Sequence, residues 1–183
     1  GGARRGRARG PPFSPVEDAT AFRRTLGAFA TGVTVVTARR PDGAPVGITA
    51  NSFASVSLSP PLVLWCPAKA SRRYAAFAGA GRFAVHVLAE GQQAACDAFV
   101  RAEGGFDAVP WEDEGGLPVL GGCLAVLLCE RHAVLEAGDH AVILGRVAEA
   151  RRRDGAPLVF QGGRYGAFLP RPRDGHPEPE GKA

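Results

Sequence analysis

The sequence contains no methionine, two tryptophans and two tyrosines in 183 residues. It has no apolar run near the ~20 residues of a membrane-spanning helix, and no hydrophobic region typical of a signal peptide. We therefore expect a cytoplasmic protein, and we take the lack of methionine at position 1 to indicate a trimmed or processed chain. A P-loop, a nucleophile elbow and an HExxH motif are also absent, which argues against the NTPases, hydrolases and zinc proteases that carry them.

Net positive charge is absent from most of the chain, although the formal net charge is +4. Four arginines lie within the first ten residues, and the remainder is neutral without them. Nucleic-acid binding needs basic residues on a folded face, so the charge pattern argues against this class. We expect a disordered basic tail over 1–13, one folded domain over 14–169 and a disordered tail over 170–183.

Cysteines are few, and their spacing is unlike that of a metal site. Cys66, Cys96, Cys123 and Cys129 form no CxxC pair, and each has apolar neighbours. Only Cys129 and His132 are close enough to resemble a ligand pair. We therefore predict reduced thiols in the core and no bound metal.

Helices are expected in three places. The capping-box spacing of residues 14–17 predicts a helix that ends near residues 31–32, with Phe22, Leu26 and Phe29 on one face. A second helix is expected from Ser71 to residue 79 or 81, and a third over 92–102. The GxGxxA match at 79–84 follows a helix and precedes a strand, the reverse of the dinucleotide-binding order, so we interpret it as a helix end.

Short β-branched and aromatic runs separated by Gly and Pro predict many strands. We expect them at 32–37, 46–50, 55–59, 62–66, 82–89, 123–135, 141–151 and 158–160, with a last turn at 162–165. The turn at 40–43 should join the first two strands as a hairpin. The patterns also predict that the strand at 55–59 is half-buried and that the strand at 62–66 is fully buried. Residues 104–122 are predicted to be a loop whose Phe106 and Trp111 cover the core. The pattern favours a mainly β fold, a closed antiparallel β-barrel with peripheral helices.

The segment from Pro45 to Arg73 combines small polar residues, a buried strand and a cationic helix start. Small residues let a backbone approach a planar ligand. Lys69, Arg72 and Arg73 surround Ser71, a good N-cap residue, and a helix N-terminus attracts anions. We favour a phosphate site over the alternative, a charged helix start on the surface.

The histidines allow more than one interpretation. His140 follows Gly138-Asp139 in a predicted hairpin turn, where it serves either the turn or a binding site. His86 is either a surface residue or faces a pocket. His132 is interpreted as structural, and His176 as an exposed tail residue.

Several motifs together resemble the flavin reductase-like family, in particular the small reductase component of two-component flavin-dependent monooxygenases. In order, they are FATGVTVVTA, GITANSFASVSLSPPLVLWCP, KASR, GRFAVHVL, FDAVPW, GDHAVILGRV and PLVFQGGRY, within residues 20–168. The resemblance implies a split β-barrel of the Greek-key, FMN-binding type that forms a homodimer. It also implies hydride transfer from NADH or NADPH to FMN or FAD, and release of reduced flavin to a separate monooxygenase.

The resemblance also implies roles for particular residues. The isoalloxazine and ribityl chain would be lined by Pro45, Val46, Gly47, Ile48, Thr49, Asn51 and Ser52. The phosphate would be held by Cys66, Pro67, Ala68, Lys69, Ser71, Arg72 and Arg73. His140 would position the nicotinamide, with Tyr165 a second candidate. The family usually has Asn where this chain has His86. No acid, base or nucleophile is required, because the flavin supplies the electron chemistry.

Two alternatives remain open at this level. One is a self-contained flavoenzyme with tightly bound FMN, and the other is a non-enzymatic flavin-binding protein. The sequence does not distinguish FMN from FAD or NADH from NADPH, and it does not identify the partner oxygenase.

Overall fold

The computed structural model describes residues 12–13, 15–101 and 105–171. Most of both predicted tails, and Ser14 of the predicted capping box, lie outside these residues. The first helix, α1 (Ala19–Leu26), begins later than predicted, because the Asp18 side chain accepts a hydrogen bond from the Thr20 N–H and caps the helix. Within the described ranges, no helix is long and apolar enough to cross a membrane.

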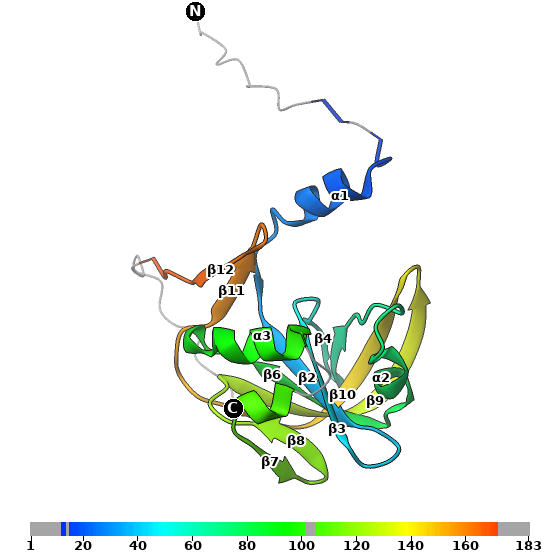
Figure 1. The fold of residues 1–183 in the computed structure, drawn as a ribbon, viewed down its shortest axis with the longest axis vertical. Helices are drawn as coiled ribbons and strands as arrows, with labels where there is room; N and C mark the ends of the chain where they lie inside the picture. The colour runs from blue at the N-terminus through cyan, green and yellow to red at the C-terminus, as the bar shows by residue number, and fades with distance from the viewer. Residues whose placement is uncertain (1–11, 14, 102–104, 172–183) are drawn as a thin grey trace, which may run out of the picture.

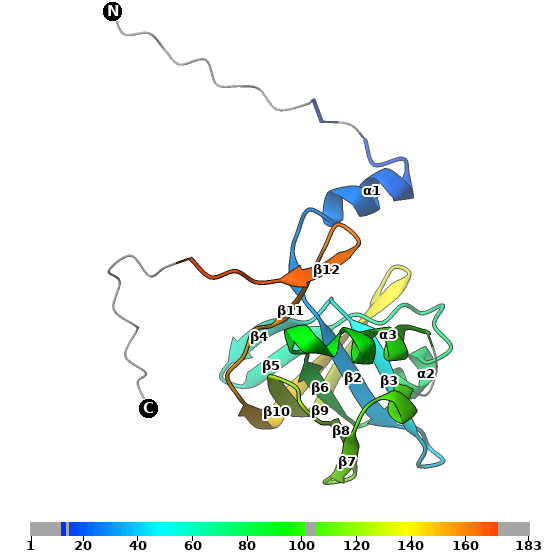
Figure 2. The same ribbon diagram turned by 60° about the vertical axis from the view of Figure 1, so that its left-hand side comes forward.

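Seven antiparallel strands form the main sheet, in the order β3-β2-β6-β9-β10-β5-β4 (Figures 1 and 2). They are β2 (Thr34–Arg39), β3 (Pro45–Ala50), β4 (Ala54–Leu58), β5 (Pro61–Trp65), β6 (Arg82–Val87), β9 (Ala125–Ala137) and β10 (His140–Arg152). The predicted mainly β, antiparallel fold is confirmed, including the β2–β3 hairpin. Strands β3 and β4 are the two edges of this sheet and are not paired with each other, so closure into a split barrel stays a prediction.

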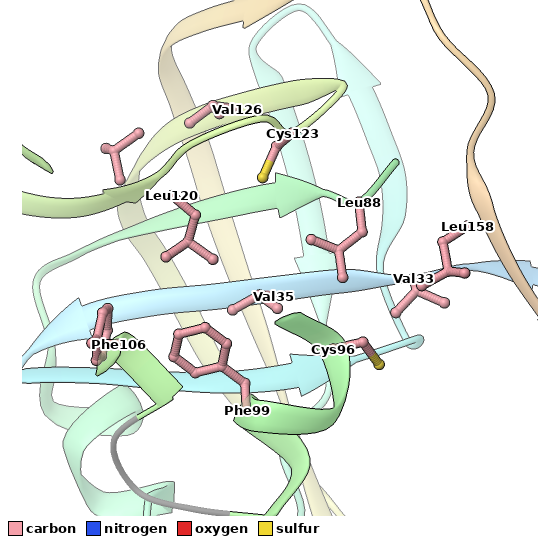
Figure 3. Packing of buried hydrophobic residues seen from close by; sticks show 11 residues of the cluster. Val33, Val35, Leu88, Cys96, Phe99, Phe106, Leu120, Cys123, Val126 and Leu158 are labelled. Atoms are coloured by element: carbon pink, nitrogen blue, oxygen red, sulfur yellow. The ribbon is translucent and has the colours of Figure 1, made fainter. Parts of the chain in front are cut away.

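The central strands β2 and β6 of the main sheet are buried on both faces, because alternate residues enter two separate cores. On β2, Val36 and Ala38 belong to one cluster with Trp65 of β5. Val35 points to the other face and joins the second cluster, with Phe99 (Figure 3). Two covered faces explain why His86, predicted to lie at the surface or in a pocket, is fully buried.

The second core is covered by helices and a small hairpin. They are η1 (Glu90–Gln92), α3 (Gln93–Arg101), η2 (Gly105–Ala108), β7 (Trp111–Glu114) and β8 (Leu117–Leu120). The predicted third helix is confirmed. The predicted loop 104–122 is wrong where it includes the β7–β8 hairpin, which exists because Gly115 and Gly116 both adopt positive φ at its turn. Phe106 does pack over the core, between Phe99 and Trp111.

A second sheet of three strands extends from the main body together with α1 (Figure 2). It consists of β1 (Thr31–Gly32), β11 (Leu158–Gln161) and β12 (Arg164–Ala167). The turn predicted at 162–165 occupies only 162–163, because residues 164 and 165 begin β12, which the sequence interpretation missed. The first helix ends at Leu26, earlier than predicted, so Phe29 lies beyond it. The predicted apolar face is exposed in this chain: Phe22, Leu26 and Phe29 are 45%, 57% and 77% exposed.

The edge of the main sheet is less buried than predicted. On β4, Val56 and Leu58 are exposed, so the expected half-buried strand is an exposed edge. On β5, Val63 and Trp65 are buried while Leu62 and Leu64 are partly exposed, so this strand is not fully buried. The reason is that β4 pairs with β5 on one side only and has no neighbour on the other among the described strands.

Candidate functional site

Most side chains of strand β3 pack into the protein core, and they support the candidate site without lining it. Val46 is fully buried in the first core, and Ile48 packs against the same cluster. Gly47 is buried, and a Cβ built there would lie 2.4 Å from Cε1 of Phe99. Its lack of a side chain is therefore required by packing against α3. Pro45 begins β3, roughly 16 Å of strand from the end nearest Asn51.

Three predicted residues converge on one pocket of about 230 Å³, which we call the β3–β12 pocket. Thr49 is the last residue but one of β3, Asn51 follows the strand, and Tyr165 comes from β12. The remaining walls are apolar: Val33, Val100 and Phe160. The pocket thus lies between the main sheet, α3 and the smaller sheet, and it combines three polar side chains with a hydrophobic lining.

The predicted phosphate segment, residues 66–73, lies against the β9–β10 turn. The N–H of Lys69 donates to the Asp139 carbonyl oxygen at 2.9 Å, and Ala68 forms a β-bridge with His140. The N–H of Ala141 donates to the Pro67 carbonyl oxygen at 3.1 Å. The structure therefore brings the predicted phosphate residues and His140 together, although they are about seventy positions apart in the sequence.

The same segment is also tied to the residues after β3. The N–H of Cys66 donates to the Ser52 hydroxyl oxygen at 2.9 Å. Burial raises the pKa of the Cys66 thiol, so this thiol stays protonated and is a poor nucleophile. The hydrogen bond between Ser52 and Cys66 joins the residues after β3 to the 66–73 segment. The contacts of these two residues with flavin stay predictions.

The cations of the segment differ in availability. The Lys69 ammonium donates to the Gly138 carbonyl oxygen at 2.8 Å and forms an ion pair with Glu136. The guanidinium of Arg73 turns inward, where it donates to the Gly47 and Phe99 carbonyl oxygens at 3.0 and 2.5 Å. Arg72 is exposed, and its side chain has no partner within the described part of the chain. Arg72 is thus the cation that can turn toward a ligand.

Ser71 does not cap the second helix, contrary to prediction. The helix, α2 (Tyr74–Gly79), has Arg73 at its N-cap and no side-chain capping bond. Instead, the Ser71 hydroxyl accepts from the Arg73 N–H at 3.2 Å, and its carbonyl oxygen accepts from the Tyr74 N–H at 2.9 Å. Ser71 therefore shapes the turn before the helix. Of the two predicted ends of this helix, residues 79 and 81, the structure has the first: α2 ends at Gly79.

His140 begins β10 directly after the turn, with its side chain 45% exposed. Its Nδ1 lies 2.8 Å from Asp139 Oδ1. This contact orients the imidazole ring while leaving Nε2 without a partner in the described structure. The residue is therefore accessible beside the 66–73 segment, as a role in positioning a ligand requires.

His86 has a structural role that neither sequence-based interpretation anticipated. Its Nδ1 lies 2.9 Å from the Val35 carbonyl oxygen, and its Nε2 accepts from the Leu120 N–H at 3.1 Å. Burial is the main cause that lowers the pKa of His86 to about 4. The neutral ring thus links β2 to β8 with one donor and one acceptor. An asparagine side chain also offers one donor and one acceptor.

Comparisons with known proteins identify the family and the fold. Residues 26–168 match the family model described as a flavin reductase like domain. The chain belongs to the flavin reductase-like family. The FMN reductase (NADH) SmoA of Agrobacterium fabrum is 53% identical over 153 residues, covering 83% of this chain and 87% of the relative. The reductase subunit HsaB of a flavin-dependent monooxygenase from Rhodococcus jostii is 45% identical over 156 residues, covering 84% and 80%.

A solved structure of the family is also similar. It is the NADH:FAD oxidoreductase SgcE6 of Streptomyces globisporus, in complex with NAD and FAD fragments. It matches with a TM-score of 0.81 at 41% identity, over 87% of this chain and 98% of that chain. The family membership inferred from the motifs is thereby confirmed.

Sequence analysis missed some residues of the candidate site. Val33, Val100 and Phe160 line the β3–β12 pocket, but the sequence presents them only as members of apolar strands and a helix. Cys96 was predicted as a core thiol, yet it also contacts Tyr165. Only the packing of β11 and β12 against α3 brings these residues together. Within the described ranges, no cluster of potential metal ligands exists.

Proposed function

We propose that this protein is an NAD(P)H-dependent flavin reductase that supplies reduced flavin to a partner monooxygenase. The observation that carries the proposal is the convergence of Thr49, Asn51 and Tyr165 on one pocket. That pocket belongs to a chain 53% identical to a relative named as an NADH-dependent FMN reductase. The names of other relatives, such as a reductase subunit of a flavin-dependent monooxygenase, support a separate oxygenase as the partner.

The donor set of the pocket fits a flat heteroaromatic ring. Hydroxyl groups of Thr49 and Tyr165 and the amide of Asn51 can bond to a polar ring edge, while Val100 and Phe160 can contact a ring face. Flavin, when bound, supplies the ring that accepts a hydride from the nicotinamide. The side chains bind and orient this ring, and the apolar wall excludes water from it. Burial is the main cause that raises the pKa of Tyr165 to about 12, so its hydroxyl stays protonated.

The 66–73 segment would hold the flavin phosphate. Arg72 is exposed beside the turn that Ser71 organises, and a guanidinium binds phosphate oxygens through charge-assisted hydrogen bonds. Lys69 adds positive charge nearby, although its ammonium is shared with Gly138 and Glu136. His140, bridged to Ala68, would position the nicotinamide.

We further propose that the protein is a homodimer. Apolar side chains gather without cover on and near α1 and beyond β12: Phe13, Val16, Phe22, Leu26, Phe29, Phe168 and Leu169. An eight-residue helix is only marginally stable in water without a packed face. A second copy that covers these residues would provide that face, as exposed apolar patches of this kind mark interaction sites.

Steady-state kinetics test the proposed reaction. NADH and NADPH are each supplied with FMN, FAD or riboflavin, and nucleotide oxidation is followed at 340 nm. We expect turnover that depends on added flavin, and a purified protein that is nearly colourless. A protein that retains a yellow cofactor and turns over without added flavin would instead be a self-contained flavoenzyme. Flavin binding with no nucleotide oxidation would contradict any reductase.

A further inference from the structure

Cys96 lies between Thr49 of β3 and Tyr165 of β12, two residues that line the β3–β12 pocket. It lies on α3 and is fully buried (Figure 3). Its backbone carbonyl oxygen accepts a hydrogen bond from the Thr49 hydroxyl at 2.7 Å. Its thiol donates to the Tyr165 hydroxyl oxygen at 3.1 Å. One residue of α3 therefore contacts both hydroxyl groups that line the pocket.

The two hydroxyl groups belong to different sheets. Thr49 is on β3 of the seven-stranded sheet, whereas Tyr165 is on β12, which pairs only with β11 among the described strands. The Tyr165 ring packs on Phe160 of the same small sheet, with ring centroids 5.2 Å apart. That contact holds the ring within its own sheet and does not connect it to β3. The Cys96 thiol provides such a connection.

We propose that Cys96 is a positioning residue for flavin: its thiol holds the Tyr165 hydroxyl at a fixed place across the pocket from Thr49. The identity of the ligand rests on the proposed function, whereas the contact itself does not. The thiol is not a nucleophile, because burial raises the pKa of Cys96. Asp97, the charged neighbour on α3, also raises the pKa of Tyr165, so the phenol remains a neutral hydrogen-bonding group.

The contact can be observed without flavin, because the chain has only two tyrosines. In a Tyr74→Phe background, tyrosine labelled with ¹³C at Cζ gives a single NMR signal, that of Tyr165. We expect Cys96→Ala to shift this signal at neutral pH and Cys96→Ser, which keeps a donor, to restore most of it. Cys129→Ala is the matched control, since it deletes an equally buried thiol from the other core. A signal unmoved by Cys96→Ala, or moved equally by Cys129→Ala, overturns the proposal.

Flavin affinity tests the consequence for binding. The dissociation constant for FMN is measured by quenching of flavin fluorescence. We expect Cys96→Ala to raise it about five-fold, the effect of one lost hydrogen bond, with kcat at saturating FMN nearly unchanged. Cys96→Ser and Cys129→Ala should stay within about two-fold of the parent on the same scale. An equal loss in Cys96→Ala and Cys129→Ala would assign Cys96 to packing alone.

A double-mutant cycle with Tyr165→Phe separates the coupling from packing. If the thiol acts through the Tyr165 hydroxyl, Cys96→Ala should cause no further loss of FMN affinity in the Tyr165→Phe protein. Additive losses would contradict the proposed coupling. If the parent protein does not bind FMN at all, the proposed function fails, whereas the NMR result still decides whether Cys96 holds Tyr165.

Discussion

The Arg73 guanidinium donates a hydrogen bond to the Gly47 carbonyl oxygen at 3.0 Å, which ties the 66–73 segment to β3. It also donates to the Phe99 and Val100 carbonyl oxygens at the end of α3. Three parts of the candidate site are thus held by one side chain. Arg73 acts within the protein framework, and its neighbour Arg72 is left to face the solvent.

Because Arg73 is bound within the protein and Arg72 is exposed, we expect their substitutions to affect the affinities for FMN and riboflavin differently. Arg72→Ala should weaken FMN but hardly affect riboflavin, which has no phosphate. The loss for FMN should be roughly 1.5–3 kcal/mol, the range for a charge-assisted hydrogen bond. Fluorescence titration with both ligands measures it. Equal weakening of FMN and riboflavin would remove Arg72 from the phosphate site.

Arg73→Ala is expected to weaken FMN and riboflavin by the same factor and to lower the melting temperature. The reason is that the change leaves the Gly47, Phe99 and Val100 carbonyl oxygens without this donor. Arg73→Lys should restore little, because an ammonium cannot reproduce the planar fork of a guanidinium. Thermal unfolding and the same two titrations check this. A loss confined to FMN would instead make Arg73 a phosphate ligand.

His140→Ala should raise KM for the nicotinamide nucleotide while leaving the dissociation constant of FMN nearly unchanged. The expectation follows from its accessible position in the β9–β10 turn beside Ala68. His132→Ala, an exposed change on the same hairpin, is the control. Steady-state kinetics with varied NADH compare the two variants. Identical nucleotide kinetics in both would leave His140 with a purely structural role in the turn.

The buried His86 should make stability depend on pH. The pKa of His86 is lowered to about 4 in the folded protein, against 6.5 for the exposed group. The unfolded chain therefore binds an extra proton between these values, and stability falls as pH decreases from 6.5 toward 4. The slope from this group is about 1.4 kcal/mol per pH unit. Above pH 6.5 it contributes no pH dependence.

The measurement is urea unfolding of the parent protein and of His86→Asn at several pH values. Asn keeps a donor and an acceptor but does not titrate, so the difference between the two proteins isolates His86 from the carboxylates. Arg151 and Glu114 are the charged groups that also influence its pKa, in opposite directions. Parallel stability curves for the two proteins would show that His86 does not titrate in this range.

The proposed homodimer predicts that charge on α1 separates the subunits. Phe22→Glu with Leu26→Glu should convert the protein to a monomer in sedimentation equilibrium, because both residues are exposed in one chain and apolar. Leu135→Glu, an exposed apolar position on the β9–β10 hairpin, serves as the control. A parent protein that is monomeric at all concentrations would refute the dimer directly.

Release of reduced flavin predicts activity without contact between proteins. The reductase and an unrelated flavin-dependent hydroxylase are placed on opposite sides of a membrane that passes only small molecules, under low oxygen. We expect hydroxylated product when NADH is added to the reductase side, because micromolar flavin binding, about −8 kcal/mol, allows exchange. If product forms only when the two proteins are mixed, reduced flavin passes by direct transfer or stays bound.

Local sequence patterns determined much of this protein. The β-branched run at 32–37 and the turn at 40–43, where Gly43 has φ of +84°, predicted the β2–β3 hairpin. The motifs of residues 20–168 predicted the family, and the glycines at 79 and 81 predicted the end of α2 to within two residues. These features depend on residues close together in the chain, so their physical causes can be read locally.

Only the tertiary structure decided which side chains are available at the site. Lys69, Arg72 and Arg73 look equivalent in sequence, but distant carbonyl groups bind Lys69 and Arg73 and leave Arg72 exposed. His86 is buried because β8 covers a face of β6 that an isolated sheet would expose. The Tyr165 hydroxyl meets Cys96 only because the smaller sheet packs beside α3. Contacts between residues far apart in the chain set burial and hydrogen bonding, and no local pattern encodes them.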